Sequence, residues 1–340
     1  MRLIKILFLL FLFVRVTDGY AQISVVRVNE QVCFPSSVPC GNYSGIVNLH
    51  NDVYAVINDK SDSTLWFRFK IEIDSVTGQI RKASCLGPGA ITTERNLDGE
   101  AITKVGNSLY LTSESLNRIK KYPILENGSR LGNDSITNCE YTFSNVFQNN
   151  YGLESLTYDT HRHLLWTAPE NTPTGWNNTY KGENNIIPLI AFDENLNEVG
   201  FINYSMDAPE APKSETYAMG VSELCSIGDN KLLVLERELY VAKMKIGSFV
   251  QNKIFYVDVS DYNKAKCNLR KKDNTEIVNK RKIYQWRTKL NITSRSFANY
   301  EGMCVGPKLK DGSLVIILVA DSQNQYAGAL KDWFKTIVIK

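Results

Sequence analysis

The chain has 340 residues, with 39 basic and 36 acidic side chains and a formal net charge of +3. A charge this close to zero gives no electrostatic basis for binding nucleic acid. The length permits two ordinary domains, but all-β architectures of this size often form a single one.

The first 21 residues have the pattern of an export signal. Arg2 and Lys5 make a basic start, residues 6–14 are apolar, and small residues favour cleavage after Ala21. The apolar segment is too short for a comfortable membrane span. We therefore expect a signal peptide over residues 1–21 and a secreted or periplasmic protein without a stable membrane anchor. A retained anchor is the alternative.

Short β-rich segments then follow along the chain, flanked by Gly, Asn or Asp turns. In chain order the clearest strand candidates are residues 64–73, 108–113, 189–192, 231–235, 253–259 and 314–319. Turn residues precede three of the strands, at 106–107, 228–230 and 311–312. A long amphipathic helix period is missing, apart from a doubtful stretch near residues 263–272. The sequence predicts an all-β fold.

A two-part phrase recurs five times among these strands. Its first position is a carboxylate before a small residue and a hydrophobe, and its second is a carboxylate that ends a hydrophobic run. The first positions are Ser44 (a weaker copy), Glu100, Glu154, Glu223 and Glu301, and the second positions are Asp59, Glu114, Glu170, Glu236 and Asp321. Successive first positions lie 56, 54, 69 and 78 residues apart.

A period in the fifties, with insertions, is the length of one four-stranded propeller blade with its loops. The wide gaps between Glu154 and Glu301 leave room for a sixth, degenerate blade. We therefore predict a six-bladed β-propeller with four-stranded blades around a carboxylate-lined central channel. The alternative is a pair of β-sandwiches whose repeats are coincidental.

Equivalent residues of a propeller converge on its axis, so the repeated acids should meet at one mouth of the channel. We expect Glu100, Glu154, Glu223 and Glu301 to meet there, surrounded by Asp59, Glu114, Glu170, Glu236 and Asp321. Like charges in one site raise one another's pKa and need protons, basic partners or bound cations. Six to eight hard oxygen ligands are what Ca²⁺ takes. The nine acids therefore predict a calcium site.

Two arginines adjoin the repeated phrases. Arg237 directly follows Glu236 and would either pair with a channel acid, bind an anionic substrate or form a surface ion pair. Arg95 precedes the phrase at Glu100 and is a second substrate-binding candidate, although a surface ion pair is the simpler interpretation. Other chemistry has little support, because the sequence contains no Gly-x-Ser-x-Gly elbow and no phosphate-binding glycine loop. His161 and His163 could ligate a metal but lie in a polar turn.

Seven cysteines follow the signal, and none forms a Cys-x-x-Cys pair, which argues against structural zinc. In an oxidising compartment some should pair, and Cys33 with Cys40 is the pairing that proximity in sequence suggests. We expect at least one of Cys225 and Cys304, which lie in apolar strands, to be a buried thiol.

Six Asn-x-Ser/Thr sequons make the chain a glycoprotein candidate. They are Asn42, Asn127, Asn133, Asn177, Asn203 and Asn291. In a eukaryotic secretory protein several would carry glycans, whereas in a bacterial protein they would have no meaning. The sequence leaves this choice open.

The phrases resemble the secreted phytase-like family described as having esterase-like activity of phytase. The matching pieces are residues 44–46 with 57–59, 98–102, 111–114, 152–156, 233–237, 299–303, 306–309 and 319–324. They span about residues 43 to 324, and Ala101 and Ser155 depart from the family's more usual Gly. The resemblance implies one phytase-like β-propeller domain over residues 22–340, with a carboxylate-rich channel and a hydrolytic activity.

Two functions are compatible with these observations. The first is a secreted phytase-like or esterase-like hydrolase that depends on Ca²⁺ and acts on a small phosphate or carboxyl ester. In that hypothesis Glu301, Glu236 and Arg237 are catalytic, Arg237 and Arg95 bind the anionic substrate, and the protein is a monomer. The alternative is a non-catalytic extracellular propeller that binds a ligand or protein and holds structural calcium in its acidic channel.

Overall fold

A computed structural model describes most of the chain. The described residues are 23–61, 63–92, 94, 97–124, 129–131, 139–144, 146–147, 151–176, 185–212, 216–271, 276–291, 295–328 and 330–340. They form β-strands and two short 3₁₀ turns, Thr174–Trp176 and Tyr326–Gly328, with no α-helix among them. None of their helical turns is long and apolar enough to cross a membrane. The predicted signal peptide, residues 1–21, lies outside the described residues.

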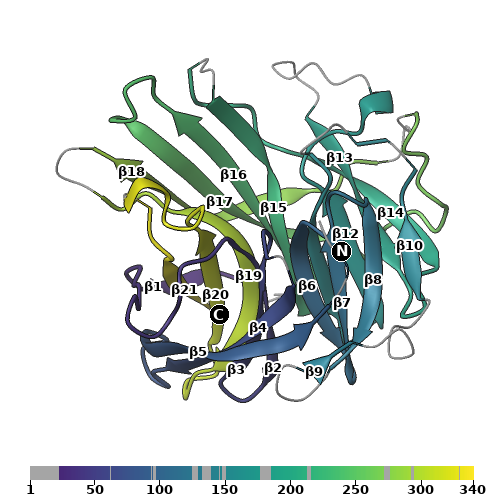
Figure 1. Cartoon of the computed structure of the whole chain (residues 1–340). Coiled ribbons are helices and arrows are strands. Elements are labelled where there is room, and N and C mark those ends of the chain that lie inside the picture. The colour runs from purple at the N-terminus through teal and green to yellow at the C-terminus, as the bar shows by residue number, and fades with distance from the viewer. Residues whose placement is uncertain are drawn as a thin grey trace, which may run out of the picture.

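Five antiparallel sheets stand around a common axis and are the blades of a propeller (Figure 1). From the axis outward, blade 1 contains β2 (Tyr43–His50), β3 (Val53–Asn58), β4 (Thr64–Ile73) and β5 (Ile80–Ile91), and β9 (Ser129–Arg130) is added in parallel. Blade 2 contains β6 (Gly99–Val105), β7 (Ser108–Ser113), β8 (Arg118–Pro123) and β10 (Glu140–Thr142). Blade 3 contains β11 (Leu153–Asp159), β12 (Leu164–Pro169), β13 (Ile186–Phe192) and β14 (Glu198–Ser205).

The last two blades complete the ring. Blade 4 contains β15 (Thr216–Gly228), β16 (Lys231–Val241), β17 (Ser248–Asp258) and β18 (Lys280–Leu290). Blade 5 contains β19 (Asn299–Lys308), β20 (Leu314–Asp321), β21 (Phe334–Ile339) and, at its outer edge, β1 (Val25–Val28). The N-terminal strand thus pairs with the C-terminal one, in the register Val25↔Ile339, and closes the ring.

The number of blades corrects the sequence prediction. The inner strands β2, β6, β11, β15 and β19 each contact the next, and β19 contacts β2, so the five described sheets already close the circle. The predicted sixth blade is wrong, whereas the all-β propeller with four-stranded blades is confirmed. The extra length before Glu301 lies largely in blade 4, whose strands have 13, 11, 11 and 11 residues.

The hydrophobic core is divided among the interfaces between neighbouring blades. One cluster of buried side chains lies between blades 5 and 1, with Tyr43, Phe69 and Phe334 in edge or tilted ring contacts. Four further clusters fill the interfaces 1–2, 2–3, 3–4 and 4–5. Each blade thus buries both faces against its neighbours. Closure of the ring also leaves only short, protected sheet edges.

Two sequence predictions about single residues can be compared with this fold. Cys225 and Cys304 are buried thiols, as expected, whereas Cys33 and Cys40 are free thiols and do not form the suggested disulfide. The sequon side chains of Asn42 and Asn203 are buried in the folded protein, which disfavours a glycan at either position. Asn127, Asn133 and Asn177 lie outside the described residues.

The tight approach of the inner strands generates a test of the fold. A Cβ at Gly45 would lie 2.8 Å from the carbonyl oxygen of Glu100 and 3.0 Å from Cα of Ala101, on the neighbouring blade. We expect Gly45→Ala to lower the free energy of unfolding by about 1–3 kcal/mol, because two backbones would have to move apart. Gly99→Ala is the matched control, since its Cβ would meet nothing closer than 3.4 Å. Equal urea midpoints for the two variants would contradict this packing.

Candidate functional site

A β-bulge near the start of each inner strand positions the first circle of side chains. Pairing with the second strand is interrupted between Tyr43 and Ile46, Gly99 and Ile102, Leu153 and Ser155, Val221 and Glu223, and Tyr300 and Gly302. The polar residues that directly follow the last regular pair are Ser44, Glu100, Glu154, Ser222 and Glu301. The first circle therefore contains three glutamates and two serines.

The two serines make equivalent contacts, which supports this register. Ser44 Oγ donates to the carbonyl oxygen of Gly99 at 2.9 Å, and Ser222 Oγ donates to the carbonyl oxygen of Tyr300 at 3.3 Å. In both cases the acceptor is the residue before the first-circle glutamate of the next blade. Ser222, not Glu223, is thus the fourth member of the circle.

The second circle follows from the same pairing. The residues opposite the start of each bulge are Asn58, Ser113, Pro169, Glu236 and Ala320. The next residue in each second strand faces the mouth, because side chains alternate along a strand. These residues are Asp59, Glu114, Glu170, Arg237 and Asp321. Arg237 therefore occupies the position of an acid.

Glu223 and Glu236 were predicted to face the mouth of the channel. Each lies one residue away from the side chain that does so, Ser222 and Arg237 respectively. Glu223 Oε1 accepts the backbone N–H groups of Leu156 at 3.1 Å and of Leu224 at 3.0 Å, and burial raises its pKa. In the other blades its position is filled by Gly45, Ala101, Ser155 and Gly302.

Glu236 lies on the opposite side of β16 from the ring. Its Oε1 accepts hydrogen bonds from the hydroxyl of Tyr204 at 2.6 Å and from Nζ of Lys280 at 2.7 Å. Neither Glu223 nor Glu236 belongs to the oxygen groups of the described residues that could hold a cation.

The remaining seven predicted acids come together and form what we call the acidic ring. Its members are Asp59, Glu100, Glu114, Glu154, Glu170, Glu301 and Asp321. Burial is the main cause that raises the pKa of Glu301 to about 8 and of Asp321 to about 6. The pKa values of Glu100 and Glu154 are also raised, first by burial and then by neighbouring carboxylates of the ring.

Arg237 is the buried counter-charge of the acidic ring. Its guanidinium donates to Glu170 Oε1 at 2.5 Å, to Glu301 and to Asn299 Oδ1 at 3.1 Å, and its side chain is 7% exposed. These carboxylates raise its own pKa further, although burial acts in the opposite direction. Arg95, the other arginine proposed from the sequence, lies outside the described residues.

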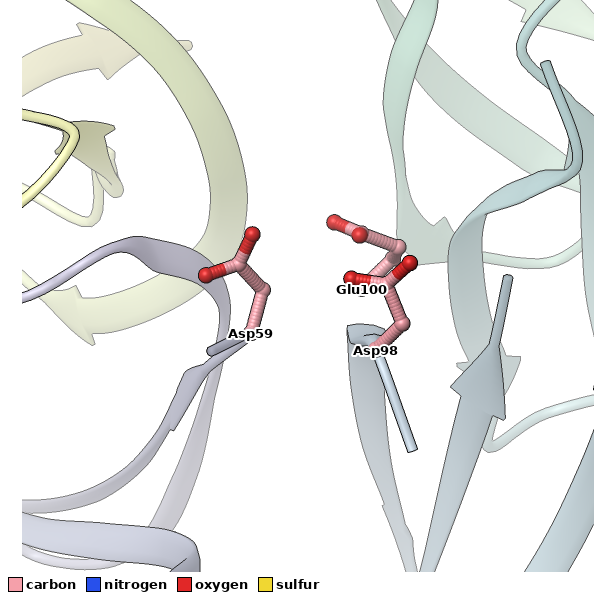
Figure 2. A group of neighbouring side chains, drawn as sticks. All are labelled: Asp59, Asp98 and Glu100. Atoms are coloured by element: carbon pink, nitrogen blue, oxygen red, sulfur yellow. The ribbon is translucent and has the colours of Figure 1, made fainter. Parts of the chain in front are cut away.

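Two groups of carboxylates are close enough to share a cation. Ligand oxygens of Asp59, Asp98 and Glu100 lie within 4.8 Å of one another, and so do those of Glu100, Glu114 and Glu154. Figure 2 shows Asp59 reaching from the end of β3 toward Asp98 and Glu100 at the start of β6. Oxygens on opposite sides of a Ca²⁺ ion are separated by about 4.6–5.2 Å, so this spacing fits.

One atom in the first group points to a missing partner. Asp59 Oδ1 is buried and has no hydrogen-bond partner in the described part of the chain.

Sequence reasoning missed Asp98 as a ligand, although it stands two residues before Glu100. Its backbone has a φ of +44°, which is uncommon for a non-glycine residue and more often tolerated by Asp or Asn.

The histidines play no part in the acidic ring. His163 lies at the surface, with Nδ1 at 3.2 Å from Glu194 Oε1, and His161 lines a cavity of about 590 Å³ at the other end of the inner strands. The sequence favours solvated turn histidines over a His161–His163 metal pair, and neither histidine belongs to the possible metal-binding groups of the described residues.

Comparison with known proteins gives one extensive match. Residues 38–323 match the phytase-like family described as "Esterase-like activity of phytase", and this range includes every member of the acidic ring. No curated protein matches the sequence. The chain is similar to glutaminyl cyclase of Myxococcus xanthus (10% identity, 92% of this chain and 97% of that chain, TM-score 0.41). It is also similar to the PQQ-bound form of aldose sugar dehydrogenase of Streptomyces coelicolor (10% identity, 94% and 98%, TM-score 0.44).

The raised pKa values predict how pH acts on the metal-free protein. Between the ordinary carboxyl pKa of 4.5 and the folded value of about 8 for Glu301, the folded state holds a proton that the unfolded chain has lost. The free energy of unfolding in EDTA should therefore fall as pH rises from about 5 to 8, by up to about 1.4 kcal/mol per pH unit for each such proton. Urea unfolding at four pH values measures it. A flat or rising profile would contradict the buried, protonated state of the ring.

The ion pairs of Arg237 generate a second test. Arg237→Met leaves Glu170 and Glu301 buried without a cation, so we expect a loss of about 3–5 kcal/mol at pH 8 and a smaller loss at pH 5. Arg162→Met is the control, because the Arg162–Asp229 pair has side chains 51% and 60% exposed and should contribute less than about 1 kcal/mol. The same urea measurement serves both variants, and losses of equal size would refute the role assigned to Arg237.

Proposed function

The chain belongs to the phytase-like family, and from this premise we propose that it is a calcium-dependent hydrolase of small phosphate or carboxyl esters. The acidic ring is its proposed active site. Secretion is part of the proposal, because extracellular fluid supplies Ca²⁺, and so is action as a monomer.

One observation carries the proposal: the oxygen group of Asp59, Asp98 and Glu100. It offers only hard oxygen donors at a spacing that fits Ca²⁺, and Asp59 Oδ1 is buried without a partner. Zinc would prefer nitrogen or sulfur ligands, which this group lacks. Glu100 also belongs to the second oxygen group, with Glu114 and Glu154, so its carboxylate would face both positions.

When bound, Ca²⁺ would polarise the phosphoryl or acyl oxygen of the ester and lower the pKa of an attacking water. The protein's own contribution is proton transfer and orientation. We assign Glu301 as the proton-transferring residue, because its raised pKa lets it exchange a proton near neutral pH. Asn299 Nδ2 donates to Glu301 Oε1 at 2.7 Å and, with Arg237, fixes its orientation.

Arg237 is a positioning residue in this proposal. Both of its terminal nitrogens donate to ring carboxylates, which fixes the guanidinium between Glu170 and Glu301. Lys60 is better placed for an anionic substrate, because its side chain is 65% exposed beside Asp59, at 3.3 Å from Oδ2. In this proposal Lys60 at the mouth, rather than Arg237, first meets the anionic group of the substrate.

A second candidate function follows from the fact that the oxygen donors belong to two different blades. Asp59 belongs to blade 1, whereas Asp98 and Glu100 belong to the strand that starts blade 2. A cation between them would join two blades whether or not any reaction follows. In that case the protein is a non-catalytic extracellular propeller, which binds a ligand or protein and holds structural calcium.

Carboxylate-to-amide variants separate the two candidates. Glu100→Gln should weaken Ca²⁺ binding at least tenfold in calorimetry and abolish the Ca²⁺-induced rise in melting temperature. Glu223→Gln is the matched control: it has the same change and similar burial, but its carboxyl lies outside both oxygen groups. Calcium affinity should stay unchanged in this control.

Turnover is measured on panels of phosphate and carboxyl esters with and without EDTA. We expect Glu301→Gln to lower kcat at least a hundredfold while Ca²⁺ affinity stays within threefold, since proton transfer contributes factors of about 10²–10⁴. Calcium binding without hydrolysis of any ester would favour the structural role. Hydrolysis that persists in EDTA would disprove the calcium-dependent enzyme.

A further inference from the structure

A cavity of about 500 Å³ lies beside the acidic ring, where blades 1 and 5 meet. Its lining residues are Gly41, Asn42, Asn58, Lys60, Gln323 and Asn324. Asn58 and Lys60 flank Asp59, and Gln323 follows the ring residue Asp321 by two positions. The cavity therefore adjoins the proposed calcium site on its blade 5 side.

The chemistry of this lining is unusual for a cavity of its size. Small-molecule sites of 300–1,000 Å³ are lined mainly by apolar side chains, whereas this one has four amides, one ammonium group and a glycine. Each amide offers both hydrogen-bond donors and an acceptor. Its described lining residues include no aliphatic or aromatic side chain that would accept an acyl chain or an aromatic ring.

A buried polar atom in the lining lacks a partner. Asn42 is 6% exposed, and its backbone N–H donates to Asn58 Oδ1 at 3.2 Å. Its own side-chain oxygen, Oδ1, is buried and accepts no hydrogen bond in the described part of the chain. This oxygen is shielded from the cavity, so the polar side chains open to a ligand are those of Lys60, Gln323 and Asn324.

The opposite wall is held in a rare backbone conformation. Gln323, Asn324 and Gln325 have φ angles of 48°, 54° and 56°, which non-glycine residues adopt infrequently. Hydrogen bonds hold the turn: Gln323 N–H donates to Asp321 Oδ1 at 2.6 Å, and Asn324 N–H donates to the Gly41 carbonyl at 3.3 Å. The turn thus ties the amides of the cavity directly to a ring carboxylate.

We propose that this cavity binds the organic group of the substrate, and that this group is a sugar-like polyol with a single anionic substituent. The inference rests on the proposed function, since it names the substrate class of the same site. The amides match vicinal hydroxyls, and Lys60 supplies a cation among the described lining residues. The neighbouring carboxylates Asp59 and Asp321 would repel negative charge beyond what Lys60 and the cation offset, which favours a single anionic substituent over several.

The test measures binding to the calcium-loaded protein by calorimetry, with three probes: glucose 6-phosphate, phenyl phosphate and inorganic phosphate. Glucose 6-phosphate should bind at least tenfold more tightly than the other two. The double variant Gln323→Gly with Asn324→Gly removes two amides and suits the positive φ angles, so it should fold at least as well as the original protein. We expect it to weaken glucose 6-phosphate about tenfold and to leave inorganic phosphate unchanged.

Asn51→Gly is the matched control, because Asn51 also has a positive φ, of 48°, but lies outside the cavity lining. It should change the affinity for none of the probes. Equal affinity for phenyl and glucose phosphates, an unaffected double variant, or no binding of any probe would overturn the proposal.

The two proposals fail separately. If glucose 6-phosphate binds as expected but no ester is hydrolysed, the polyol site stands and the hydrolase is wrong. If esters are hydrolysed with Ca²⁺ but without preference for a polyol group, the hydrolase stands and the polyol site is wrong.

Discussion

The mutual repulsion of carboxylates at one mouth of the propeller is the constraint on which the structure depends. Five blades bring ten equivalent positions to this mouth, two from each blade. Seven of them hold acids, and the other three hold Ser44, Ser222 and Arg237. Each of these three residues stands where the other blades have a carboxylate and so removes a negative charge. Arg237 also adds a positive charge, which Glu170 and Glu301 share. Protons or cations must balance what remains.

The same constraint explains why the ring divides into two unlike halves. Arg237 of blade 4 holds Glu170 of blade 3 and Glu301 of blade 5 through ion pairs. On the side of blades 1 and 2 the carboxylates of Asp59, Asp98 and Glu100 face one another, and the basic partner found there among the described residues is the exposed Lys60 beside Asp59. A buried arginine thus neutralises one half of the ring, whereas the other half has an exposed lysine and the oxygen spacing that fits a cation.

Much of this was predictable from the sequence, because repeated strands of a closed fold must place equivalent residues together. The family resemblance and the all-β propeller are confirmed, and seven of the nine predicted acids do meet. The errors lie in blade 4, where Glu223 and Glu236 stand one residue away from Ser222 and Arg237. Blade 4 has glutamates directly beside the equivalent ring positions. The alternation of strand faces and the bulge, however, decide which side chain reaches the mouth.

The predicted number of blades was wrong for a different physical reason. Chain length between repeats does not distinguish an additional sheet from longer strands in an existing one. The structure uses much of that length in the long strands β15 to β18 and in the connection between β17 and β18, residues 259–279. The outer region of this blade carries its own ion pairs, such as Lys280 with Glu236 and Lys253 with Asp207. Those pairs also explain why Glu236 is buried yet unavailable to the ring.

The asymmetry of the ring determines how a substrate would lie in the proposed active site. Oxygen donors for the cation lie at blades 1 and 2, the proton-transferring Glu301 lies on blade 5, and the amide-lined cavity lies between blades 5 and 1. An ester whose organic group fills that cavity would place its anionic centre beside Asp59 and Lys60, toward the cation. Glu301 would then approach from the blade 5 side, with Arg237 behind it. The replacement of ring acids by Ser44, Ser222 and Arg237, which lowers the negative charge, therefore also fixes the orientation in which a substrate would bind.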